Sequence, residues 1–107
     1  MSGYFSIETA TMVKTTSKSN LKTDLKILKS RILKEEYATL LSNLVKIGAL
    51  KFEIVSYKKQ NEDGVTYFYR NKRKRVTVKL KDSVVQSEHV CWRMAVLLHE
   101  LAHVLHF

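Results

Sequence analysis

The chain has 107 residues, of which 45% are hydrophobic and 27% charged, with 19 Lys and Arg against 10 Asp and Glu. This length and composition fit one folded domain and exclude a large multidomain enzyme and a disordered chain. The longest wholly apolar run, residues 94–98, is far shorter than the ~20 residues that a membrane-spanning helix needs, so no membrane is expected. The formal net charge of +9 favours a polyanionic partner.

The N-terminal segment indicates where the protein is located and where its folded part begins. No basic start followed by an apolar block is present, so we expect an intracellular protein, nuclear in a eukaryote and otherwise cytoplasmic. The single cysteine, Cys91, agrees with a reducing compartment. Residues 1–19 are rich in Ser and Thr without a sustained hydrophobic period, which predicts a flexible arm before a domain at 20–107.

The first predicted element of this domain is a long helix. Its apolar residues recur at intervals of three or four from Leu21 to Ile47. Asn20 or Thr23 is expected to cap its start, and Gly48 to end it in the left-handed conformation.

The next predicted elements are strands. Residues 51–57, 65–70 and 75–80 are rich in β-branched and aromatic side chains, and the Asp63-Gly64 pair is a strong hairpin signal. We expect them to form a three-stranded antiparallel sheet. A final helix begins at Asp82 or Ser83 and runs to the chain end. The predicted fold class is therefore α+β: an N-terminal helix, the sheet and a C-terminal helix.

The final helix carries the sequence His99-Glu100-Leu101-Ala102-His103. Residues four apart project from adjacent turns of one helix face, so the two imidazoles can reach one zinc ion as ligands. Zinc lowers the pKa of a bound water to about 7, and Glu100 is placed to act as the catalytic base. The sequence thus predicts a Zn²⁺ cofactor held by His99 and His103.

A purely structural interpretation is that the two histidines are partly buried and hydrogen-bonded, with Glu100 at the helix rim. The apolar surroundings of the motif weigh against it, because buried polar groups cost free energy unless they are paired. His106 stands about 10.5 Å of helix rise from His99, too far to bind the same ion from a straight helix. We expect His106 to lie beside the site, His89 to be exposed or a cap, and Cys91 to be buried.

The segment 96–103, with His106 three residues later, resembles the active-site helix of zinc metallopeptidases of the SprT-like and WLM groups. The order of elements agrees over about residues 20–107, but only the last dozen residues match specifically. The resemblance implies a minimal peptidase core whose members with known roles cleave proteins crosslinked to DNA. In those families the third zinc ligand follows this helix, so a chain that ends at Phe107 is predicted to hold a metallopeptidase-like domain incomplete at its C-terminus.

A second motif is a dense run of cations, which comprises Arg70, Lys72, Arg73, Lys74 and Arg75. Such a run attracts phosphates and releases counterions, which predicts contact with nucleic acid. A nuclear import signal and a solvated turn are the alternatives.

Two functions follow from these motifs. The first is a zinc-dependent metalloendopeptidase that cleaves protein substrates associated with DNA, with the cationic run facing the DNA. The alternative is a small basic nucleic-acid-binding module whose peptidase site is degenerate and inactive.

Overall fold

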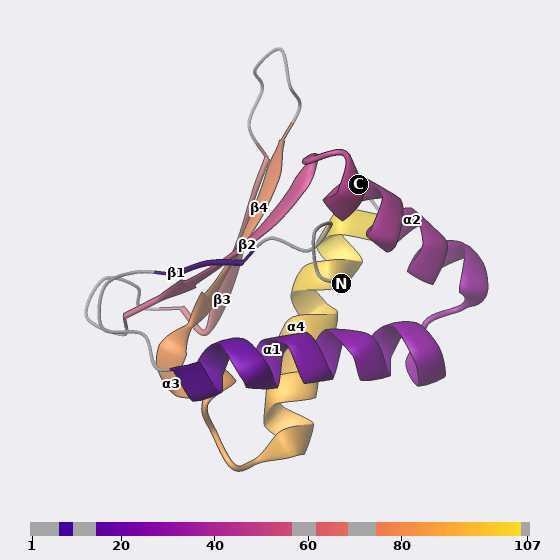
Figure 1. Ribbon diagram of the computed structural model, residues 1–107. Coiled ribbons are helices and arrows are strands. Elements are labelled where there is room, and N and C mark those ends of the chain that lie inside the picture. The colour runs from indigo at the N-terminus through magenta and orange to yellow at the C-terminus, as the bar shows by residue number, and fades with distance from the viewer. Residues whose placement is uncertain (1–6, 10–14, 57–61, 69–74, 106–107) are drawn as a thin grey trace.

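The computed structural model describes residues 7–9, 15–56, 62–68 and 75–105 (Figure 1). In chain order its elements are β1 (Ile7–Thr9), α1 (Thr15–Ile27), the π-helix η1 (Leu28–Ile32), α2 (Glu35–Lys46), β2 (Leu50–Val55), β3 (Gly64–Phe68), β4 (Val76–Lys81), α3 (Asp82–Val85) and α4 (Val90–Leu105). The predicted α+β class is confirmed. Among the described residues, no helix has the length and apolar character needed to cross a bilayer.

The sheet has four strands in the order β1-β2-β4-β3. Strand β2 pairs in parallel with both β1 and β4, and β3 pairs antiparallel with β4. The predicted three-stranded antiparallel sheet is therefore wrong: the sheet has a fourth strand, β2 pairs with β4 and not with β3, and both pairings of β2 are parallel. Only the β3–β4 hairpin follows the expectation.

The position of β4 explains this difference. Val76, Val78 and Leu80 are all buried, whereas Tyr67 and Phe68 of β3 are about two-fifths exposed. The strand whose apolar side chains are buried takes the interior place beside β2, and β3 is left at the edge. Sequence adjacency favoured pairing β2 with β3, but burial decided otherwise.

The segment predicted as one long helix consists of three pieces. Helix α1 begins at Thr15, inside the expected flexible arm, and the expected cap Asn20 lies within it, where its Nδ2 donates to the carbonyl oxygen of Val85 at 2.9 Å. The π-turn of η1 and an extended Leu33 then reverse the chain direction. This reversal lets α2 bury Leu41 and Val45 in the same core, which a straight helix would not reach.

Gly48 ends α2 as predicted. Its φ of 76° lies in the left-handed region, where a residue with a side chain is strained. The amide nitrogen of Ala49 then donates to the carbonyl oxygen of Leu44 at 2.8 Å, which closes the helix end and leads the chain into β2.

The core lies between the sheet and helices α1, α2 and α4, which gather on one side of it (Figure 1). Leu28, Phe52, Ile54, Val78 and Leu101 have exposed fractions of 0% and form its centre. Full burial of a side chain of this size stabilises the fold by about 1.5 to 3 kcal/mol, so this cluster is its main source of stability.

A polar contact fixes α1 against α4 inside this apolar frame. Arg93 donates from Nε to Oδ2 of Asp24 at 3.0 Å and from Nη2 to Oδ1 at 3.2 Å. Its Nη1 also donates to the carbonyl oxygen of Ser87 at 2.6 Å. The two side chains are only 12% and 4% exposed, so the charges are compensated almost without water.

Replacing Arg93 with Ala leaves the Asp24 carboxylate buried without its cation. We expect the free energy of unfolding to fall by about 3 kcal/mol, the cost of breaking a buried pair from one side. Denaturant unfolding measures this loss. The control is the exposed Lys22→Ala on α1, the helix that carries Asp24, and it changes stability by less than about 0.5 kcal/mol. Equal stability of the two variants would contradict the role given to the pair.

Candidate functional site

Helix α4 has one face in the core and one toward solvent. Leu97, Leu101 and Val104 are buried, with exposed fractions of 2%, 0% and 6%. Because a helix turns 100° per residue, these anchors direct His99 and His103 away from the core, and both are exposed.

The two imidazole rings approach each other with their Nε2 atoms. The Nε2 atoms of His99 and His103 lie 3.2 Å apart, the ring centroids are 4.8 Å apart, and the planes are nearly perpendicular at 88°. Two ligands bonded at about 2.0 to 2.1 Å to one tetrahedral zinc ion would lie about 3.3 to 3.4 Å apart. The pair therefore has the nitrogen spacing of a two-histidine zinc site that faces solvent.

A hydrogen bond between two neutral imidazoles has the same spacing, so the distance by itself fits both arrangements. In the part of the chain that the structure describes, no group of three or more His, Cys, Asp and Glu side chains gathers to hold a metal. Within these residues the pair therefore offers two nitrogen donors without a third protein ligand. His106 lies outside the described residues.

Glu100 differs from its neighbours because it points into the protein. It is only 5% exposed and lies between α4 and the edge strand β3. The Thr66 hydroxyl donates to its Oε1 at 2.7 Å. Among the described residues no Lys or Arg forms an ion pair with Glu100, so its main contact is a neutral hydroxyl.

Gly64 makes room for this carboxylate. A Cβ at position 64 would lie 2.9 Å from Cγ of Glu100 and 3.1 Å from both Cδ and Oε2. Gly64 does not use the left-handed conformation, unlike Gly48. The glycine is therefore required for close approach of strand and helix, whereas the sequence suggested only a turn.

Burial of a carboxylate with one neutral hydrogen bond is an expensive way to pack a helix on a sheet, because a leucine would fill the space without removing a charge from water. The arrangement places a carboxylate under the sheet edge, one residue along α4 from the exposed His99.

Sequence reasoning missed Thr66 and Gly64. Both belong to β3, and only the register Thr66↔Val78 and Gly64↔Leu80 turns them toward the helices. The alternation of the strand was a signal for their shared face, but not for which helix lies over it.

The other predicted residues are spread over the chain. Arg75 is half-buried just before β4, while Arg70, Lys72, Arg73 and Lys74 lie outside the described residues. His89 is exposed, which was one of its two expected states. The expectation that Cys91 is buried is wrong, because it lies on the solvent face of α4.

Comparison of the chain with protein-family models, with curated proteins and with solved structures finds no match.

Replacing Gly64 with Ala forces Glu100 away from Thr66. We expect a loss of about 1 to 2 kcal/mol in the free energy of unfolding, because the extra methyl group overpacks this contact. The same substitution in a Glu100→Ala background meets no carboxylate and is nearly neutral. A double-mutant cycle from denaturant unfolding measures the coupling. Equal losses in both backgrounds would show that the contact does not restrict position 64.

Proposed function

We propose that this chain is the core of a zinc-dependent metallopeptidase of the SprT-like or WLM type, with His99 and His103 as zinc ligands and Glu100 as general base. The observation that carries the proposal is the combination, on one helix, of two exposed histidines whose Nε2 atoms lie 3.2 Å apart with the buried Glu100 carboxylate that Thr66 holds. The spacing agrees with that of two ligands of a tetrahedral ion.

Zinc, when bound, polarises the peptide carbonyl and makes a water molecule acidic. The other steps belong to Glu100. As the water oxygen attacks the carbonyl carbon, the carboxylate accepts a proton from the water, and it passes this proton to the amine nitrogen when the C–N bond breaks. Thr66 holds Oε1 by its hydrogen bond and so orients the carboxylate before the reaction.

The edge strand β3 supports a polypeptide as the substrate. Strand β4 pairs with one side of β3, and no described strand pairs with its other side. An edge strand can bind an extended peptide through main-chain hydrogen bonds. Since Thr66 lies on β3 and contacts Glu100, a peptide along this edge would run next to the proposed base.

The net charge of +9 supports proteins associated with DNA as the substrates. The cationic run from Arg70 to Arg75, most of which lies outside the described residues, is the predicted DNA contact. We place this activity inside the cell, in agreement with the free Cys91.

The metal site is tested by titrating zinc into the purified chain in a calorimeter. We expect one zinc ion per chain, and His103→Ala to weaken zinc binding at least roughly tenfold because it removes one of two protein ligands. His89→Ala is the matched control, since His89 is exposed and outside the pair, and it should bind zinc as the unchanged chain does. Equal zinc binding by both variants would exclude the histidine pair as the site.

The base is tested separately from the metal. Glu100→Gln keeps the shape of the side chain, so we expect unchanged zinc binding and a loss of about 100-fold or more in the cleavage of an unfolded protein such as β-casein. Thr66→Val should lower cleavage less, because it removes only the orienting hydrogen bond. Cleavage by Glu100→Gln at the rate of the unchanged chain would refute the enzymatic proposal.

A further inference from the structure

The exposed face of α1 is a row of lysines. Lys18, Lys22 and Lys26 follow one another at intervals of four residues and are all exposed. Consecutive members are therefore separated by about 6 Å along one side of the helix. None of the three forms an ion pair with a residue that the structure describes. We call Lys18, Lys22 and Lys26 the lysine row.

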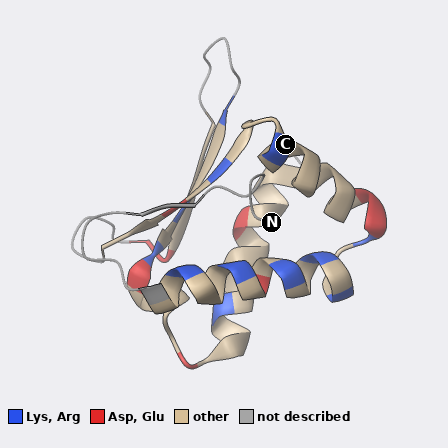
Figure 2. Cartoon of the chain, in the orientation of Figure 1, with Lys and Arg blue, Asp and Glu red and all other residues tan. Residues whose placement is uncertain are grey.

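The surroundings of the lysine row are basic and polar. Lys29, Arg31 and Lys34 continue the positive charge beyond α1, and Figure 2 shows these cations along α1 and the turn that follows it. The only acidic residue from 15 to 34 is Asp24, which is buried and paired with Arg93. Within residues 15–34 every exposed charge is therefore positive. The carboxylate of Asp82, which accepts a hydrogen bond from the Ser17 hydroxyl, and Glu35 border this positive surface.

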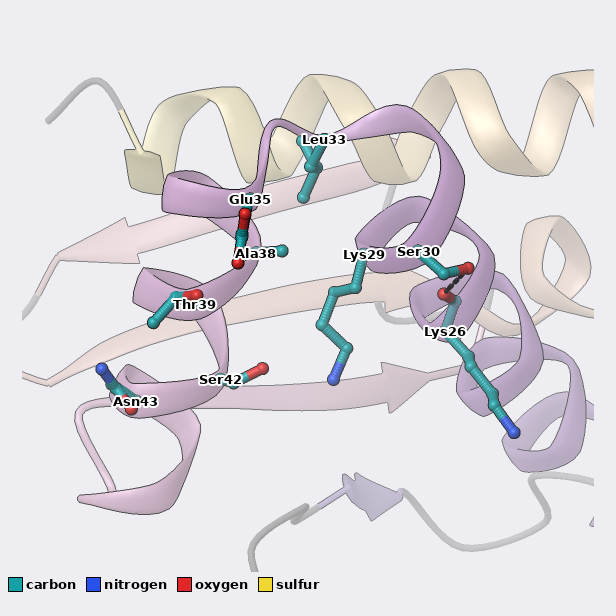
Figure 3. Close-up of a pocket in the computed structure, with 9 residues that line it drawn as sticks. All are labelled: Lys26, Lys29, Ser30, Leu33, Glu35, Ala38, Thr39, Ser42 and Asn43. Atoms are coloured by element: carbon teal, nitrogen blue, oxygen red, sulfur yellow. Dashed lines mark hydrogen bonds between the residues drawn. The ribbon is translucent and has the colours of Figure 1, made fainter.

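A groove continues from the end of the lysine row. It measures about 630 Å³ and separates α1 and η1 from α2. Figure 3 shows Lys29 extending into the space between η1 and α2. The groove is lined by Lys26, Lys29, Ser30, Leu33, Glu35, Ala38, Thr39, Ser42 and Asn43. Most of these side chains carry an ammonium, hydroxyl or amide donor, with one carboxylate at Glu35.

We propose that the lysine row and this groove bind the sugar-phosphate backbone of duplex DNA without regard to sequence. Lys, Ser, Thr and Asn side chains are the usual donors to phosphate oxygens, and such contacts position a protein on DNA without reading bases. The three ammonium groups in line are followed by a groove that adds Lys29, the donors of Thr39, Ser42 and Asn43, and one carboxylate at Glu35. Together they give a track of mostly positive charge for one strand.

The same surface does not suit insertion into a membrane. Leu21 and Leu25 face the core and are at most 2% exposed, so α1 has no free apolar side to enter lipid. In η1, Leu28 is buried and Ile32 alone is an exposed large apolar side chain. The exposed residues of α1 from 16 to 26 are Thr16, Lys18, Ser19, Lys22, Thr23 and Lys26. This inference goes beyond the proposed peptidase and depends neither on the zinc site nor on residues 70–75.

The test measures binding of a fluorescein-labelled DNA duplex of about 20 base pairs by fluorescence anisotropy, between about 50 and 200 mM salt. Lys18→Ala/Lys22→Ala/Lys26→Ala should weaken binding roughly 10- to 100-fold and lower the slope of log affinity against log salt by about 2 to 3. The control Lys46→Ala/Lys51→Ala/Lys79→Ala removes the same charge from α2, β2 and β4, and it should keep most of the affinity.

Circular dichroism and thermal unfolding establish that both variants fold. Equal binding of two duplexes of unrelated sequence, together with the selective loss in the lysine-row variant, supports the proposal. Absence of DNA binding by the unchanged chain would overturn it, as would an equal loss in the control. Stronger binding to phosphatidylserine vesicles than to DNA, abolished by the lysine-row variant, would also overturn it. Because zinc binding is measured separately on His103→Ala, failure here leaves the peptidase proposal intact.

Discussion

Docking of helix α4 on the sheet is the constraint on which the candidate site depends. Leu97, Leu101 and Val104 anchor the helix in the core, and this fixes the rotation of the helix about its axis. The directions of the other side chains of α4 then follow, because an α-helix turns by 100° per residue. The two histidines turn to solvent with their Nε2 atoms together, while Glu100 turns under β3. A different rotation would bury the imidazoles and expose the carboxylate.

This docking requires a matching edge strand. Gly64 has no side chain where the Glu100 carboxylate lies, and Thr66 presents its hydroxyl two residues further along the same face. Strand β3 therefore does more than complete the sheet. It removes the carboxylate from water and orients it, and its other edge is the place where we propose that a peptide binds.

Helices α4 and α1 differ in how their charged side chains are used. Arg93 is the only cation of α4, and it is used internally with Asp24. Helix α1 has the opposite character, with lysines outward and leucines inward. The Asp24–Arg93 pair joins the two helices. Helix α4 contributes the proposed chemistry, and α1 contributes the proposed contact with a polyanion.

The sequence alone determined those features that depend on spacing along the chain and on local backbone preferences. They are the α+β class, the end of α2 at Gly48, the β3–β4 hairpin and the shared face of His99 and His103. The tertiary structure decided what depends on partners distant in sequence. The parallel pairing of β2 with β4 follows from burial of Val78 and Leu80, and the reversal at Leu33 lets α2 reach the core. The contact of Glu100 with Thr66 and Gly64 joins residues more than thirty positions apart. No local pattern contains it, because it exists only when the helix lies on the strand.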